Sequence, residues 1–349
     1  MRFGVFDQND ANGLPIADQY RERLRLASLY DECGFHTFQM SEHHGTPLST
    51  TPSPSVFLAA LSQRTRTLRF GPLVYLLPGH NPLRLAEEIA MLDNLSEGRF
   101  EFGIGRGASP HEMGYLGVAP DEMKPMYAEA LEIIRKGLTT GTLDHQGRYW
   151  QYDGVELSVR PVQAPHPPLW VALGSPDSAV WPAQNGANIV VGAPADRARL
   201  IFERYVAERA LVPAAAGWEA PLLGLNRYVV VAESDGAAYE LAERCWNVFY
   251  GNFIKLWRRH GGTPANRLPE DFAAAHASGS AIVGSAATVR AILADQLKAS
   301  GANYLASVLV FGDMSFAEAS RSIRLFAHDV MPALTPVGEQ AHARLLEAA

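Results

Sequence analysis

Short apolar runs alternate with amphipathic segments along the whole chain. The runs are nearly continuous in apolar residues, which is typical of strands buried on both faces of a parallel sheet. The amphipathic segments between them have the spacing of helices with one apolar face. The predicted strands are residues 3–6, 35–40, 68–77, 100–104, 169–173, 187–191, 222–231 and 304–311.

Helix start signals separate these runs. Ser53-Pro54 and Asn81-Pro82 each place a capping side chain before a proline in the first turn. Ser315 and Glu318 form a capping-box pattern after the last predicted strand. After the fourth strand, the pattern predicts a long loop and then a helix over residues 121–136.

This alternation predicts an α/β fold, a (β/α)8 TIM barrel with insertions, forming a single domain over residues 1–349. An open doubly wound sheet is the alternative architecture. Residues 142–160 change to polar–aromatic alternation, which indicates a hairpin excursion from the barrel. Residues 237–280 are a candidate lid, and a solvated surface insertion explains the same segment equally well.

Composition narrows the function classes. A formal net charge of −7 disfavours a nucleic acid or an anionic membrane as partner. The two cysteines, Cys33 and Cys245, have no C-x-x-C spacing, so a disulfide framework or a zinc ribbon is not expected. The apolar run near the N-terminus is too short for a signal peptide, and no run has the length of a membrane span. We therefore expect a cytoplasmic protein.

The carboxyl ends of barrel strands carry the active site, so polar residues there are the first functional candidates. Ser41-Glu42-His43-His44 follows the second strand and offers a carboxylate beside two imidazoles for acid–base work. Adjacent residues of an extended strand point to opposite sides, so we expect His44 to face away from His43. For the same reason the pair does not form a metal site, and no metal is expected.

A glycine-rich segment follows the fourth strand. Gly103, Gly105 and Ala108 match a dinucleotide fingerprint, but the predicted helix begins too late for that fold. The glycines permit close approach of a ligand, and Arg106 offers a fork-shaped donor for a phosphate. A glycine-rich turn with a surface arginine is the alternative interpretation.

After the fifth strand, Gly174 and Ser175 begin a small, hydroxyl-rich turn that leads into a helix. Free backbone amides at such a turn can hold an anion, and an ordinary helix cap explains the same residues. Around the third strand, Leu73, Val74 and their neighbours form an apolar edge suited to a flat ring or simply to core packing.

With these clusters, the sequence resembles the bacterial luciferase-like flavin-dependent monooxygenases over nearly the whole chain. The specific part of the match is residues 34–44, with their Ser-Glu-His-His end, and residues 68–107. Residues 168–186 and 301–334 also follow the family pattern, and the terminal unit 301–334 is the weaker evidence. The resemblance implies one (β/α)8 barrel, reduced FMN at the carboxyl ends of the strands, and dioxygen as co-substrate.

The resemblance also implies residue roles. His43 matches the active-site base of the family, and Glu42 is its neighbour in the flavin pocket. Leu73 and Val74 stand where relatives have a non-proline cis peptide bond beneath the flavin ring.

For the flavin phosphate, Arg106 matches the arginine that binds it in the family. Ser175, with the backbone amides that follow it, matches the second half of the phosphate-binding site. Lys124 stands where relatives often have an arginine reaching the same phosphate. Two departures argue against light emission. Gly105 replaces a reactive cysteine of light-emitting luciferases, and Gly174 replaces an acidic residue.

The predicted function is therefore an FMN-dependent monooxygenase that oxygenates a small organic substrate, with reduced flavin supplied by a separate flavin reductase. Relatives often pair through the helices next to strands two and three, which implies a homodimer. The alternatives are a deazaflavin-dependent hydride-transfer oxidoreductase on the same barrel and a non-catalytic flavin-binding protein. A metal-dependent hydrolase built on Glu42 and His43 is a further alternative, and it requires bound metal.

Overall fold

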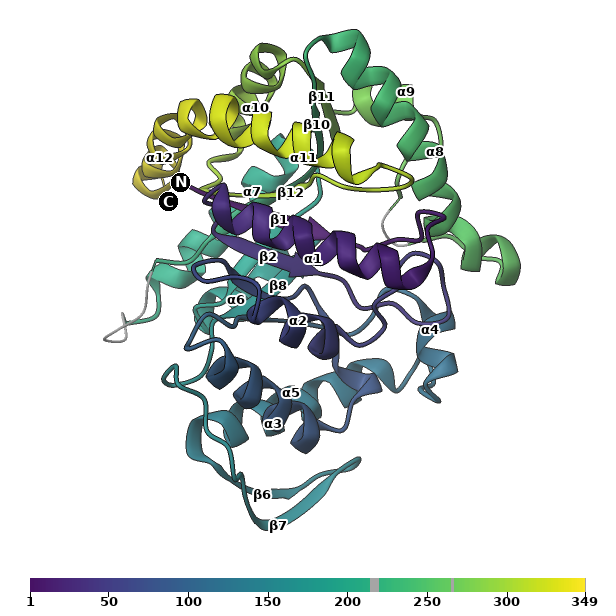
Figure 1. Ribbon diagram of the computed structural model, residues 1–349. Coiled ribbons are helices and arrows are strands. Elements are labelled where there is room, and N and C mark those ends of the chain that lie inside the picture. The colour runs from purple at the N-terminus through teal and green to yellow at the C-terminus, as the bar shows by residue number, and fades with distance from the viewer. Residues whose placement is uncertain (214–219, 265–266, 349) are drawn as a thin grey trace.

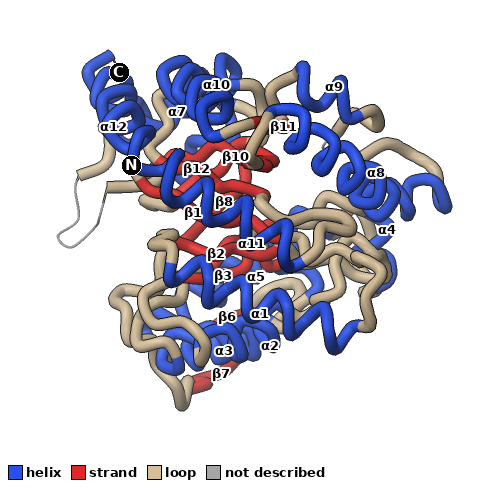
Figure 2. The backbone as a smooth tube through the Cα atoms, turned by 45° about the horizontal axis from the view of Figure 1, so that its top comes forward, coloured by secondary structure: helices blue, strands red, loops and turns tan. Residues whose placement is uncertain are grey.

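The computed structural model describes residues 1–213, 220–264 and 267–348. A ring of parallel strands lies at its centre, and helices surround the ring (Figures 1 and 2). Both chain ends lie on the same side of the barrel, where the Met1 amine pairs with Glu339 at 2.9 Å. The strands of the ring are β1 Arg2–Asp7, β2 Thr37–Met40, β3 Arg69–Pro72, β4 Tyr75–Leu76, β5 Phe102–Gly105, β8 Leu169–Leu173, β9 Asn188–Val191, β10 Leu223–Val231 and β12 Tyr304–Val308.

The third position of the ring is shared by two short strands. β3 and β4 are the two ends of the predicted strand 68–77, with residues 73 and 74 between them. β3 pairs with β2, whereas β4 pairs with β5, and a parallel bridge joins Phe70 to Phe100. The remaining strands continue in the order β2, β1, β12, β10, β9, β8 and β5, all parallel. This closed arrangement of strand positions confirms the predicted (β/α)8 barrel and excludes the open sheet.

Helices cover the outside of the ring, and several begin where the sequence predicts. The Asn81 side chain accepts a hydrogen bond from the Arg84 amide, and Ser315 and Glu318 form a complete capping box. The helices of the barrel are α1 Ile16–Glu32, α2 Pro54–Ser62, α3 Pro82–Leu95, α5 Met123–Thr140, α6 Val180–Gln184, α7 Ala195–Ala210, α10 Ala286–Ser300, α11 Phe316–Leu325 and α12 Met331–Ala348, with shorter turns at Leu77–Gly79, Pro176–Ala179 and Phe326–Val330.

The segment after β5 differs from the prediction. The long loop expected before residue 121 contains a short helix, α4 Pro110–Tyr115. The Ser109 side chain caps this helix by accepting a hydrogen bond from the Glu112 amide at 3.3 Å. The start signal is the same serine–proline pair that opens α2. The prediction missed the helix because only six residues follow, too few for a recognisable apolar period.

Two segments depart from the strand–helix alternation. β6 Thr142–Gln146 and β7 Gln151–Glu156 form an antiparallel hairpin within the range 142–160. The candidate lid range contains the long helix α8 Asp235–His260 and the short helix α9 Phe272–Ala277, and residues 265–266 of it lie outside the described residues. An unpredicted strand, β11 Ala281–Gly284, pairs with residues Tyr228–Val231 at the carboxyl end of β10.

Large aromatic side chains fill the interior of the ring. Trp170 of β8 and Tyr304 of β12 are fully buried, with their ring centroids 4.9 Å apart. Gly4 and Gly224 make room for Tyr304, since a Cβ at Gly4 would lie 1.8 Å from its hydroxyl oxygen. The barrel is therefore a packed core, and ligands must bind at one of its ends.

Candidate active site

A buried carboxylate organises the carboxyl end of β2. The strand ends at Met40, and Glu42 lies in the loop that follows, with its side chain almost completely buried. Its carboxylate accepts hydrogen bonds from His44 Nε2 at 2.8 Å, His80 Nε2 at 2.9 Å and the Leu76 amide at 3.0 Å. Glu42 thus joins the loop after β2 to the segment after β4.

These donors keep Glu42 ionised. Burial alone would raise the pKa of Glu42, but the hydrogen bonds from His44, His80 and the Leu76 amide outweigh it and lower the pKa from 4.5 to about 2. The hydrogen bond between Glu42 and His44 also raises the pKa of His44. Because an ionised carboxylate only accepts hydrogen bonds, both histidine nitrogens that face it carry a proton.

His43 is held by a different carboxylate. Its Nδ1 lies 3.2 and 3.1 Å from the two carboxylate oxygens of Glu112 on α4. Glu112 also accepts a hydrogen bond from the His44 amide at 2.8 Å, so it fixes the backbone beside the imidazole. The His43 side chain is 21% exposed. With Nδ1 donating to Glu112, Nε2 is the nitrogen left to take or return a proton.

The sequence predicted that His44 faces away from His43 on an extended strand, but the strand ends before both residues, and the two side chains bind different carboxylates. The chain leaves the sheet at Met40, and the His44 side chain turns onto buried Glu42 within the same polar network. Sequence reasoning also missed Glu112. The signal that points to it is the pattern Ser109-Pro110-His111-Glu112, which places an acidic residue in the first turn of a capped helix.

The structure has a cis peptide bond between Leu73 and Val74, between β3 and β4, as the family resemblance implied. Two glycines of β5 pack against this segment. A Cβ at Gly103 would lie 2.6 Å from the Pro72 carbonyl oxygen, and one at Gly105 would lie 2.3 Å from Val74 Cγ2. The sequence had predicted that these glycines make room for a ligand. In the structure they make room for the neighbouring Pro72–Val74 segment.

Three of the predicted phosphate ligands lie exposed at the same end of the barrel. Arg106 follows β5, and Lys124 lies in the first turn of α5. Burial raises the pKa of Tyr127, also on α5, to about 12, and the Arg106 charge opposes that rise, so Arg106 lies near this helix. Ser175 follows β8, the strand next to β5 in the ring.

The turn after β8, which was predicted to hold the phosphate, is exposed to solvent. Gly174 is exposed, and a Cβ built there would meet no atom within 4 Å. The Ser175 amide donates to the Ser178 hydroxyl at 3.3 Å, and that hydroxyl donates to the Ser175 carbonyl at 2.5 Å. Asp177 adds a negative charge in the same turn. These contacts are local, and they leave Gly174 and Ser175 facing open space.

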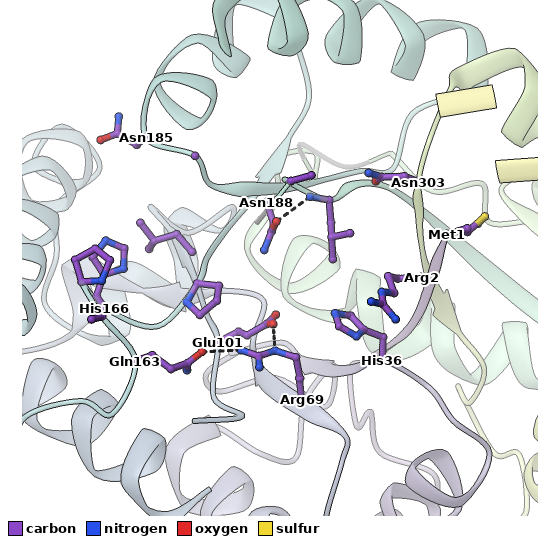
Figure 3. A pocket seen from close by; sticks show the side chains of 17 residues that line it. Met1, Arg2, His36, Arg69, Glu101, Gln163, His166, Asn185, Asn188 and Asn303 are labelled. Atoms are coloured by element: carbon purple, nitrogen blue, oxygen red, sulfur yellow. Dashed lines mark hydrogen bonds and ion pairs between the residues drawn. The ribbon is translucent and has the colours of Figure 1, made fainter. Parts of the chain in front are cut away.

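The opposite end of the barrel has a cavity of about 590 Å³, lined by residues at the amino ends of the strands (Figure 3). Its polar groups largely satisfy one another. Arg69 pairs with Glu101 and donates to Gln163 at 2.9 Å, and Asn188 accepts from the Leu222 amide at 2.8 Å. This pairing is typical of a structural region, and the candidate chemistry lies at the other end.

Across residues 1–213, 220–264 and 267–348, no helix combines the length and apolar character needed to cross a membrane. Within the same ranges, no group of three or more His, Cys, Asp or Glu side chains is arranged to hold a metal ion.

Comparison with known proteins agrees with this geometry. The model of the luciferase-like monooxygenase family matches residues 1–304. The chain is 44% identical to the protein y4wF of Sinorhizobium fredii over 90% of this chain and 92% of that protein. It is 30% identical to the oxygenase component of the flavin-dependent trigonelline monooxygenase of Acinetobacter baylyi, over 74% of this chain and 72% of that protein.

Solved structures extend the comparison. The monooxygenase RslO1 from Streptomyces bottropensis superposes with a TM-score of 0.85 at 26% identity, over 95% of this chain and 99% of that one. The coenzyme F420-dependent tetrahydromethanopterin reductase from Methanopyrus kandleri shares the fold, with a TM-score of 0.70 at 18% identity over 95% and 98%. The barrel, the family match and these relatives together establish that the chain belongs to the luciferase-like monooxygenase family of flavin-dependent oxidoreductases.

Proposed function

We propose that the chain is the oxygenase component of a two-component system that uses reduced FMN and dioxygen to oxygenate a small organic substrate. The observation that carries the proposal is the pairing of His43 with Glu112 at the barrel end where Arg106 and Lys124 are exposed. A partly exposed imidazole and exposed cations at the same end of the barrel suit a phosphate-bearing cofactor and a proton-transfer step.

The residues present fit FMN. Arg106, Lys124 and the Gly174–Ser175 turn would hold the phosphate, and Leu73 and Val74 would lie beneath the ring. When bound, FMN supplies the redox chemistry with dioxygen. His43 would move a proton at Nε2, with Glu112 on Nδ1 fixing the tautomer. The Glu42 side chain is almost completely buried, so we propose that it acts by holding His44 and His80 at the carboxyl end of the barrel.

The decisive experiment is oxygen uptake by the protein with reduced FMN against a panel of substrates, with products identified by mass spectrometry. Trigonelline belongs in the panel because of the Acinetobacter relative. An oxygenated product, with uptake that depends on substrate, supports the proposal. Tight FMN binding with only peroxide release would instead favour a non-catalytic flavin-binding protein.

Two controls separate the remaining alternatives. Replacing FMN with a reduced deazaflavin and following its absorbance tests the hydride-transfer oxidoreductase. Activity that vanishes with a chelator and returns with zinc would favour the metal-dependent hydrolase. The FMN proposal expects the chelator to have no effect. A flavin reductase added with NADH and FMN should substitute for chemically reduced FMN. We propose that the oxygenase and its reductase work together in the cytoplasm.

We also propose a homodimer that forms through α2 and α3, which pack side by side. Three large apolar side chains on their outer surface are exposed: Val56 at 73%, Met91 at 50% and Leu95 at 49%. Val56→Glu combined with Met91→Glu should convert the dimer to a monomer in light scattering after gel filtration. A wild-type chain that is already monomeric at micromolar concentration would contradict this part of the proposal.

A further inference from the structure

The short helix α4 has contacts on two sides. On one side, Glu112 holds His43, and the Tyr115 ring packs on Gly45, where a Cβ would lie 2.9 Å from Tyr115 Cε2. On the other side, α4 meets the end of α8. The Tyr115 hydroxyl lies 2.7 Å from His260 Nε2, and His111 Nε2 donates to the Gly261 carbonyl at 3.1 Å.

Ring packing reinforces the contact with α8. The His111 ring lies edge-on to Trp257, with centroids 5.0 Å apart, and 5.1 Å from the His260 ring. These residues are about 145 positions apart in the chain, and they join the segment after β5 to the segment after β10. Figures 1 and 2 both show the end of α8 beside α4.

α8 is itself anchored to the barrel. Asn252 donates to the Asp10 carboxyl at 2.9 Å and to the Ala11 carbonyl at 2.8 Å, in the loop after β1. Trp246 and Phe249, earlier in the helix, are fully buried in the core. A helix held at these points presents its last turn at a defined place, whereas a six-residue helix such as α4 has little stability of its own.

We propose that the end of α8 positions the His43 imidazole through α4, with Tyr115 and His260 as the positioning residues. This inference rests on the proposed role of His43 as the base. The Tyr115–His260 bond holds α4 against α8, and α4 in turn holds Glu112 against His43 Nδ1. Without that bond, α4 shifts, the Glu112–His43 bond weakens, and the imidazole no longer keeps a single tautomer.

The test compares Tyr115→Phe and His260→Ala with wild type by 15N NMR of protein labelled on histidine, without cofactor. His43→Gln assigns the His43 signals by removing them. Wild type should show His43 with its proton on Nδ1, and both variants should show a mixture of the two tautomers. Tyr239→Phe, which removes a hydroxyl from α8 far from α4, is the matched control and should match wild type.

A second variant tests whether the hydrogen bond itself is required. His260→Gln keeps a polar group within reach of the Tyr115 hydroxyl, and it should restore the wild-type tautomer signals that His260→Ala loses. In turnover with reduced FMN, Tyr115→Phe and His260→Ala should lower kcat roughly three- to tenfold, the loss expected for one net hydrogen bond, with KM unchanged.

Unchanged His43 signals in both variants would overturn the positioning role, even if the melting temperature falls. The NMR result is independent of the reaction. If the signals change as expected but no oxygenated product forms with any substrate, the positioning contact stands and the proposed monooxygenase function fails.

Discussion

His43 Nδ1 lies 3.1 Å from Glu112 Oε2, although 69 positions separate the two residues in the chain. This carboxylate–imidazole pair joins the loops after two strands of the barrel. It gives the imidazole a fixed orientation and leaves its other nitrogen, Nε2, outside this bond.

Replacement of His43 by alanine should suppress product formation while folding and flavin binding persist. Loss of a general base typically lowers the rate by about 10²–10⁴-fold. Glu112→Gln should lower it less, because the base remains but loses the charge that orients it. Substrate-coupled oxygen consumption and peroxide release measure both effects.

His44→Ala, which leaves buried Glu42 with one hydrogen-bond donor fewer, should reduce stability more than rate. Normal coupling in His43→Ala with loss in His44→Ala would assign the base to His44.

Arg106→Ala should weaken FMN binding more than riboflavin binding, because only FMN carries the phosphate. A charge-assisted hydrogen bond is worth roughly 1.5–3 kcal/mol, which is more than tenfold in affinity. Fluorescence titration of the flavin measures both dissociation constants. Lys124→Ala should act in the same direction, whereas Arg84→Ala, at an exposed position of α3 where Arg84 pairs with Glu88, is the control. Equal losses for the two flavins would place Arg106 away from the phosphate.

Glu42→Gln should change the acid side of the stability profile. The folded-state pKa of Glu42 is depressed from 4.5 to about 2, so its ionised form stabilises the native state above pH 4.5. That contribution is lost as the pH falls towards 2. The difference in unfolding free energy between wild type and Glu42→Gln should therefore shrink over this window in urea titrations. The pKa of His44, measured by NMR, should also fall in the variant. A constant difference from pH 5 to 2 would contradict the prediction.

Asp10→Asn should have the opposite pH dependence. Burial raises the pKa of Asp10 from 3.8 to about 7, against the opposing charge of Arg23. Between these values the native state holds a proton that the unfolded chain has released, so wild type loses stability as the pH rises from about 4 to 7. The variant has no titrating group at this position. Its unfolding free energy should therefore rise relative to that of wild type as the pH increases across the same window. Parallel curves for the two proteins would show that Asp10 is already ionised in the native state.

The sequence by itself determined most elements of the barrel and their order, but not the short helix α4 or the strand β11. The Asn81 cap and the first-turn prolines Pro54 and Pro82 act through local backbone chemistry, so their helices begin where the pattern indicates. The apolar runs place the strands of a parallel barrel, and with them Glu42 and His43 at a strand end where ligands bind.

Only the tertiary structure decided which of these residues act together. Glu112 reaches His43, His80 reaches Glu42, and His260 reaches Tyr115 because closure of the ring brings separate loops to one rim. Gly103 and Gly105 proved to serve strand packing against the Leu73–Val74 segment, a close approach that their own spacing does not encode. The periodicity of a strand or helix describes which side a residue faces, whereas a contact between loops depends on the path of the whole chain.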